Sequence, residues 1–181
     1  MKQKSISTYD ICIIAVFTAI IAVMAQIVIP MPYGVPMTMQ TLAIMLAGVL
    51  LGVKRGTIVV LLYVLIGAIG APVFAAMTGG PGTVFGPTGG FILSFPILAL
   101  SVGLGADQNN KLWLWSGLII GVSINYLSGA AYFSIITSNT FQTSLKVCVL
   151  PFIPTDIIKI LIAGLLGIKI RSLIPNRIIS R

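Results

Sequence analysis

Two charged side chains lie inside the last long apolar stretch of the chain, which runs from Val147 to Ile170. Asp156 and Lys159 would each cost roughly 2.5 to 3.5 kcal/mol at the centre of a membrane helix on insertion scales. Because they are spaced i, i+3, they share one helical face. Whatever role justifies one charged residue in this stretch therefore involves the other as well. They are the first candidates for a binding site.

Two interpretations of this pair are open. The first is an ion pair within one helix, which lets a slightly polar helix insert but leaves both charges poorly solvated. The second is a ligand with an anionic end and neutral N–H donors, because an ammonium binds an anion and an aspartate accepts from N–H groups. We favour the ligand, since it gives both residues a partner.

The composition indicates an all-α integral membrane protein. Hydrophobic residues make up 57% of the chain, charged residues only 8%, and the mean hydropathy is +1.11. A soluble domain typically carries about 25% charged residues. We therefore expect one compact domain over residues 1–181 that has lipid as its solvent.

Length and Pro/Gly punctuation divide the chain into six apolar segments, which we predict to be transmembrane helices. The second segment is short for a full span, and the cluster of Pro and Gly between the first two predicts an irregular connection. The expected spans are 11–29, 37–52, 57–76, 90–105, 112–136 and 147–170.

The basic excess, a formal net charge of +8, is explained by membrane topology. Six spans with cytoplasmic N and C termini place most basic residues inside, leave Lys146 outside and put Lys159 within the membrane. A nucleic-acid patch is the minor alternative. The residues placed inside are Lys2, Lys4, Lys54, Arg55, Lys111, Lys169, Arg171, Arg177 and Arg181.

A glycine-rich loop, residues 79–90, connects the third and fourth predicted helices and carries no charge. Non-helical backbone at membrane depth is tolerated where it is buried in protein or lines a cavity, and glycine lets a ligand approach closely. We expect this loop to cap an outward-facing pocket, with an ordinary surface turn as the open alternative. A Walker-type nucleotide loop is excluded, because no lysine lies between Arg55 and Lys111.

Few other polar residues occur at span depth. Asn125 lies in the fifth segment and Gln40 near the start of the second. Such residues more often form interhelical hydrogen bonds than contact a ligand. In this topology, however, both lie with Asp156 and the glycine loop at a shared outward-facing pocket. Aromatic residues that would supply its apolar walls are Tyr33, Phe74, Phe85, Phe91 and Tyr126.

Catalysis and metal binding find little support in the composition. The chain has three Asp but no Glu or His, which leaves no acid–base pair and no imidazole ligand for zinc or haem. Cys12 and Cys148 have no ligand-like spacing. An intramembrane enzyme or the anchor subunit of a redox complex is therefore the least favoured class.

Small residues recur at helix-packing intervals. Gly48 with Gly52, Gly117 with Gly121, and Ala163 with Gly167 predict close contacts between segments of this chain. In the first segment a similar stripe faces either another helix of the chain or a partner subunit, and spacing alone slightly favours the first. This stripe consists of Ala15, Ala19 and Ala22.

Several motifs in order resemble the BioY family, the biotin-binding substrate-specificity (S) components of energy-coupling factor (ECF) transporters. The resemblance covers essentially the whole chain. Its motifs are Met37 to Thr41, Gly79-Gly80-Pro81-Gly82, Gly86-Pro87-Thr88-Gly89-Gly90, Asn125-Tyr126, and Pro154-Thr155-Asp156-Ile157-Ile158-Lys159.

The resemblance implies a six-helix, multi-pass protein of a prokaryotic cell membrane that binds biotin from outside. It implies closure by the loops between helices one and two and between three and four. It further implies that this chain hydrolyses nothing and has no cofactor, while a coupling transmembrane subunit and two ATPase subunits supply energy. The Ala15, Ala19 and Ala22 stripe would then face the coupling subunit, which reverses the preference from spacing. A self-sufficient transporter without ATPases is the alternative.

Carried onto this sequence, the resemblance implies a biotin site. Lys159 would face the valerate carboxylate, and Asp156 with Asn125 would engage the ureido ring, unless both charged residues share one end of the ligand. Gln40 and the glycine loop would close around the bicycle. The remaining expected contacts are Gly82, Phe85, Thr88, Tyr126, Phe74, Tyr33 and Phe91.

Overall fold

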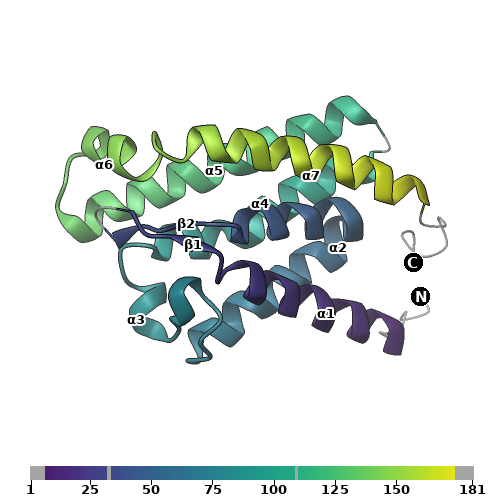
Figure 1. Cartoon of the computed structure of the whole chain (residues 1–181), viewed down its shortest axis with the longest axis horizontal. Coiled ribbons are helices and arrows are strands. Elements are labelled where there is room, and N and C mark those ends of the chain that lie inside the picture. The colour runs from purple at the N-terminus through teal and green to yellow at the C-terminus, as the bar shows by residue number, and fades with distance from the viewer. Residues whose placement is uncertain (1–6, 32–33, 109, 174–181) are drawn as a thin grey trace, which may run out of the picture.

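The computed structural model describes residues 7–31, 34–108 and 110–173, and nearly all of its regular structure is helical (Figure 1). This confirms the predicted all-helical class. The elements in chain order are α1 (Thr8–Met24), β1 (Val28–Ile29), β2 (Met37–Thr38), α2 (Gln40–Ala68), the 3-10 helix η2 (Ala75–Met77), α3 (Pro81–Val84), α4 (Gly89–Asp107), α5 (Lys111–Thr137), α6 (Phe141–Cys148) and α7 (Ile153–Leu173).

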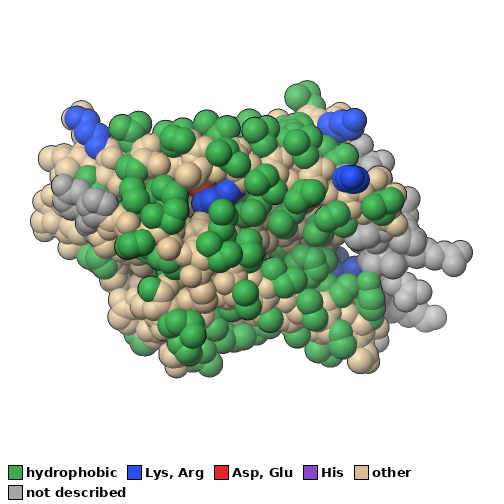
Figure 2. Space-filling model, in the orientation of Figure 1, with side chains coloured by type: hydrophobic (Ala, Val, Ile, Leu, Met, Phe, Trp, Pro, Cys, Tyr) green, Lys and Arg blue, Asp and Glu red, His purple; other side chains and the backbone are tan. Residues whose placement is uncertain are grey.

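Three helices, α2, α4 and α5, are each long and apolar enough to cross a membrane. Helices α6 and α7 pass the same test as a pair, although a break bends them by 59°. The described residues therefore contain three or four candidate spans by this measure, and α1, with 17 residues, is shorter. Figure 2 shows hydrophobic side chains over much of one face of the molecule, as expected for a surface in lipid.

Helix α2 folds back on itself at Gly52. The backbone of Gly52 has φ 72° and ψ −171°, which is not helical and which favours glycine. A Cβ atom on Gly56 would lie 3.0 Å from the Cα atom of Gly48. A straight helix would separate these two residues by about 12 Å, so α2 must consist of two packed arms. The arms correspond to the second and third predicted segments.

One end of the bundle collects the start of α1, the turn in α2, the α4–α5 connection and the end of α7 (Figure 1). We call this the terminal end. Two ion pairs join helices there, between Asp10 and Arg55 at 2.6 Å and between Asp107 and Arg171 at 2.8 Å. The other Asp107 carboxylate oxygen accepts from the backbone N–H of Val53 at 3.0 Å, directly after the turn in α2.

The predicted small-residue contacts are present between helices. A Cβ atom on Gly48 would lie 2.9 Å from the Ala99 carbonyl oxygen on α4, and one on Gly117 would lie 2.5 Å from the Ser101 carbonyl oxygen. A Cβ atom on Gly167 would overlap the Val49 side chain. These glycines allow α4 to pack between α2 and α5, and α7 to pack on α2.

The structure corrects several predicted boundaries. Helix α1 ends at Met24 rather than residue 29, and residues 28–29 instead pair with β2 in a short antiparallel ribbon, with Val28 opposite Thr38. Helix α2 ends at Ala68, so residues 69–76 of the predicted third segment are not α-helical. The predicted sixth segment, 147–170, divides into the end of α6 and most of α7.

Two of these three differences have a physical cause in the positions of the prolines. Two parts of the connection between α1 and α2, residues 28–29 and 37–38, satisfy backbone groups by strand pairing, which apolar length alone does not predict. Pro151 falls in the break between α6 and α7, whereas Pro154 lies in the first turn of α7, where its missing N–H costs nothing.

Candidate ligand-binding cavity

A cavity of about 360 Å³ lies between the β ribbon, the segment after α2, and the N-terminal ends of α4 and α7. This volume is within the range of small-molecule sites in proteins. We call this end of the bundle the ribbon end. Most of the residues proposed from sequence to bind ligand line the cavity, namely Gln40, Phe74, Thr88, Phe91, Asn125, Tyr126, Asp156 and Lys159.

The Asp156–Lys159 pair lies in the cavity wall at the start of α7. The Lys159 ammonium is 2.6 Å from the Asp156 Oδ1 atom, and each residue is only 5% exposed. The ammonium also donates to the Thr38 backbone oxygen at 2.7 Å and to the Thr41 hydroxyl at 3.2 Å. All three ammonium hydrogens therefore have protein partners, and the ion pair within one helix coexists with a position in the cavity wall.

Tyr126 orients the aspartate of this pair. Its hydroxyl donates to the Asp156 Oδ2 atom at 2.6 Å, while Oδ1 is taken by Lys159. The contact joins α5 to α7 across the cavity wall. Tyr126 was expected to be an apolar wall residue, but its hydroxyl also has a polar role in fixing the carboxylate.

Asn125 lines the cavity and keeps one acceptor that no described donor uses. Its amide nitrogen donates to the Phe91 carbonyl oxygen at 3.0 Å and to the Ser94 hydroxyl at 2.7 Å. A carbonyl oxygen can only accept, so the atom that faces Phe91 must be the nitrogen. Both amide hydrogens are thereby used, and within the described residues no donor bonds to Oδ1. A ligand N–H group has an acceptor here.

Gln40 belongs to a buried hydrogen-bond chain. Its amide nitrogen donates to the Tyr63 hydroxyl at 2.8 Å, and that hydroxyl donates to the Val73 carbonyl oxygen at 2.9 Å. Gln40 thus connects the cavity wall with both arms of α2 and with the segment that follows. This interhelical role is the one that such a residue most often has in a membrane protein.

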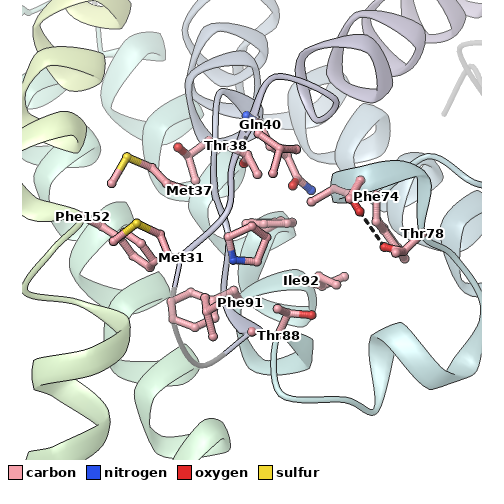
Figure 3. A pocket seen from close by; sticks show the side chains of 18 of the residues that line it. Met31, Met37, Thr38, Gln40, Phe74, Thr78, Thr88, Phe91, Ile92 and Phe152 are labelled. Atoms are coloured by element: carbon pink, nitrogen blue, oxygen red, sulfur yellow. Dashed lines mark hydrogen bonds between the residues drawn. The ribbon is translucent and has the colours of Figure 1, made fainter.

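Aromatic and methionine side chains form the apolar part of the cavity. Figure 3 shows Phe91, Phe152 and Met31 on one side of the opening and Phe74 on the other. The Phe74 ring is 1% exposed and packs edge-to-face on the Tyr63 ring, with ring centroids 5.5 Å apart. Phe74 and Phe91 were expected in this role from sequence.

The glycine-rich loop contributes threonines rather than glycines to the cavity. Thr83 and Thr88 line it, whereas Gly82 and Phe85 do not, and Phe85 is 66% exposed. A Cβ atom on Gly82 would meet nothing within 4 Å, so that glycine is not required by a close approach. A ligand role for Gly82 and Phe85 thus has no support from the cavity lining. Tyr33 lies outside the described residues.

Charge in the cavity wall comes from one ion pair. Asp156 and Lys159 are the charged residues among the described lining residues, and together they are neutral. In the described part of the chain no three His, Cys, Asp or Glu side chains cluster as metal ligands would. The cavity wall is therefore mostly apolar, with polar groups at a few fixed positions and with its two charges paired.

Sequence reasoning missed several wall residues. Thr38 contacts Lys159 through its backbone oxygen, which leaves no side-chain signal in a sequence. Thr41 is a hydroxyl one position after Gln40, and its place at the start of an apolar helix was the available clue. Met31, Met37 and Phe152 resemble ordinary core residues, and their contribution depends on how the ribbon and α7 meet.

Comparison with known proteins gives one consistent family. The BioY family model matches residues 1–176. A protein from Pyrococcus horikoshii named "Probable biotin transporter BioY" is 35% identical over 172 residues, covering 95% of this chain and 99% of that protein. The "Biotin transporter BioY" of Thermotoga maritima is 35% identical over 163 residues, covering 90% of this chain and 95% of that one.

The fold is also similar to a solved structure. The crystal structure of the S-component for biotin from an ECF-type ABC transporter superposes with a TM-score of 0.87 at 28% sequence identity. The match covers 100% of both chains. The similarity therefore includes the cavity end as well as the helical bundle.

Proposed function

This chain belongs to the BioY family, and we infer that it binds biotin as the S component of an ECF-type transporter. The proteins it resembles are named as biotin transporters, and the chain is a transporter component and not an enzyme. The observation that carries the proposal is the cavity, which combines an ion pair, a free amide oxygen and aromatic walls.

Biotin has groups that match each of these features. Its ureido ring carries N–H donors, its bicycle and valerate chain are apolar, and its carboxylate is an anion. The Asn125 Oδ1 atom is placed to accept from a ureido N–H, and Phe74 and Phe91 offer flat apolar surfaces. Lys159 is the cation among the described lining residues.

We assign the carboxylate to Lys159 through an exchange of partners. The Thr41 hydroxyl is the most distant of the three groups that accept from the ammonium, at 3.2 Å, and a ligand carboxylate would take its place. The freed hydroxyl can donate to the same carboxylate. Because the Asp156 and Lys159 side chains are only 2.6 Å apart, both belong to one end of the ligand, and Asp156 acts by holding the ammonium.

We propose six spans, formed by α1, the two arms of α2, α4, α5 and α7, with both termini in the cytoplasm of a prokaryote. The folded-back α2 and the BioY membership support this count. The terminal end holds most of the described basic residues, which is the side the positive-inside rule assigns to the cytoplasm. The cavity at the ribbon end would then open outward.

We propose that α1 contacts the coupling transmembrane subunit. Ala15 and Ala19 are exposed on α1, and Ala19 lies in a shallow apolar groove, whereas Ala22 is partly buried against the core. A smooth exposed face suits close helix packing with a partner. Two ATPase subunits would supply the energy, and this chain would need no cofactor of its own.

Titration of the purified protein with biotin, thiamine and riboflavin tests the function. We expect tight binding of biotin only, because the cavity pairs one cation with one amide acceptor at separate positions. Isothermal titration calorimetry in detergent measures all three ligands on one preparation. Equal affinity for the three vitamins, or no binding of biotin by correctly folded protein, would reject the proposal.

A further inference from the structure

One side chain, Gln26, ties the end of α1 to a wall of the cavity. Its amide nitrogen lies 2.9 Å from the Ala22 carbonyl oxygen and 3.1 Å from the Phe74 carbonyl oxygen, and donates to both. Its Oε1 atom accepts from the Met77 backbone N–H at 2.9 Å. The side-chain amide thus satisfies a donor and an acceptor of residues 73–78, which we call the wall segment.

The wall segment is thin. Phe74, Ala75, Ala76 and Thr78 line the cavity, yet Ala76 and Thr78 are also exposed on the outer surface. The Phe74 N–H donates to the Thr78 carbonyl oxygen at 2.9 Å, which closes the base of the segment. A displacement of this segment would therefore widen the opening of the cavity.

The two parts of the wall segment, a first half of residues 73–74 and a second half of residues 75–78, are held in place by different contacts. The first half is anchored in the bundle, because the Tyr63 hydroxyl bonds to the Val73 oxygen and the Phe74 ring fills a notch at Gly67. The second half lacks such an anchor, since Met77 is 66% exposed. Among the residues that the structure describes, its hydrogen bond to the rest of the bundle is the one from the Met77 N–H to Gln26.

The second half is also strained. Ala76 and Met77 are consecutive non-glycine residues with φ of 53° and 56°. Left-handed backbone is unfavourable for residues with a Cβ atom, and such strain persists only when the surroundings enforce it. Removing the Gln26 contact would therefore let residues 75–77 relax away from this conformation.

We propose that Gln26 is a positioning residue that keeps the wall segment closed over bound ligand and so sets the rate at which ligand leaves. The proposal rests on biotin binding for the identity of that ligand. Gln26 does not line the cavity itself, and it acts through the wall segment. It also makes the end of α1, the helix of the proposed partner contact, a direct support of the cavity wall.

The Gln26→Met variant tests this, because methionine keeps the length of the side chain and removes its hydrogen bonds. We expect biotin to dissociate about tenfold faster from this variant than from the wild type, equivalent to about 1.4 kcal/mol. Gln142→Met is the matched control, since Gln142 is exposed on α6, and its dissociation rate should be unchanged. Stopped-flow or radiolabel chase experiments measure the rate.

Hydrogen–deuterium exchange gives a second measurement that needs no ligand. The peptide that contains the Met77 amide should exchange faster in Gln26→Met than in either the wild type or Gln142→Met, because that amide loses its acceptor. A structural defect alone would lower the number of binding sites per protein without changing the dissociation rate of the sites that remain. That result, or an unchanged rate with a full number of sites, would overturn the proposal.

The two proposals fail in different ways. If the wild type does not bind biotin, the proposed function falls, and the exchange rates alone then decide whether Gln26 holds the wall segment. If the wild type binds biotin but Gln26→Met behaves as the wild type in both measurements, only the role of Gln26 is rejected.

Discussion

The three aspartates of the chain form ion pairs at two ends of one helical bundle, and the ion pairs differ between the two ends in which helices they connect. At the terminal end Asp10 pairs with Arg55 and Asp107 with Arg171. At the ribbon end Asp156 pairs with Lys159. The terminal pairs connect different helices, whereas the ribbon-end pair lies within one helix.

Burial separates the ribbon-end pair from the Asp107–Arg171 pair, whereas Arg55 of the other terminal pair is itself only 9% exposed. The Asp107 and Arg171 side chains are 43% and 21% exposed, while those of Asp156 and Lys159 are 7% and 6% exposed. A pair between helices near solvent has an evident structural use. A buried pair within one helix is a costly way to stabilise a fold, because desolvation can exceed the attraction. The difference indicates that the ribbon-end pair is kept for what enters the cavity beside it.

Replacing the buried pair by neutral residues should distinguish most clearly between a role in biotin affinity and a role in the stability of the fold. In the double variant Asp156→Asn/Lys159→Met we expect biotin affinity to fall at least about 100-fold, or about 2.7 kcal/mol, because the carboxylate loses its cation. Thermal stability should be largely unchanged, since both charges are removed together and no buried charge is left unpaired. Calorimetric titration and a thermal melt of the same sample measure both.

Biotin methyl ester is the matched control on the ligand side. It should bind the wild type more weakly than biotin does, and the double variant should not distinguish acid from ester. If the wild type bound the acid and the ester equally, the carboxylate would not contact Lys159. If the double variant bound biotin as the wild type does, the pair would be structural and the contrast between the two ends would disappear.

Much of this cavity could be predicted because charged and amide side chains are rare in apolar segments. Asp156, Lys159, Asn125 and Gln40 were identified on that basis, and all four line the cavity. Phe85 was included because it is an aromatic residue in the glycine-rich loop, but that residue ends the single turn of α3 and is exposed. Residue type could not reveal this orientation.

Other features could not be predicted because they depend on backbone geometry. The β ribbon arises where prolines suggested an irregular connection, and Thr38 contributes its carbonyl oxygen. The two arms of α2 were expected as separate segments, and the φ of Gly52 gives the physical cause of the break between them. Gln26 occurs near the end of the first apolar segment, where a polar residue is ordinary, so its contacts appear only in three dimensions.

The Tyr126 hydroxyl should matter less than the ion pair that it supports. In Tyr126→Phe, Asp156 loses one hydrogen bond but keeps Lys159, so we expect biotin affinity to fall about fivefold, equivalent to about 1 kcal/mol. Tyr132→Phe removes a hydroxyl from the same helix without touching Asp156, and it should bind biotin as the wild type does. Equal losses in both variants would mean that the effect comes from α5 packing and not from Asp156.

The smallest effect is expected at the terminal end. Arg171→Gln removes the partner of Asp107 and the bond to the Val49 oxygen, and because this pair is partly exposed the loss should be below about 1 kcal/mol. The melting temperature should fall by at most about 4 °C, and biotin affinity should stay within about twofold of wild type, or about 0.4 kcal/mol. Lys169→Gln, with the same loss of charge from an exposed position on α7, should leave both unchanged. Arg171 and Asp107 do not line the cavity. A tenfold loss of biotin affinity in Arg171→Gln without a lower melting temperature would therefore show that the terminal pair influences ligand binding at the ribbon end.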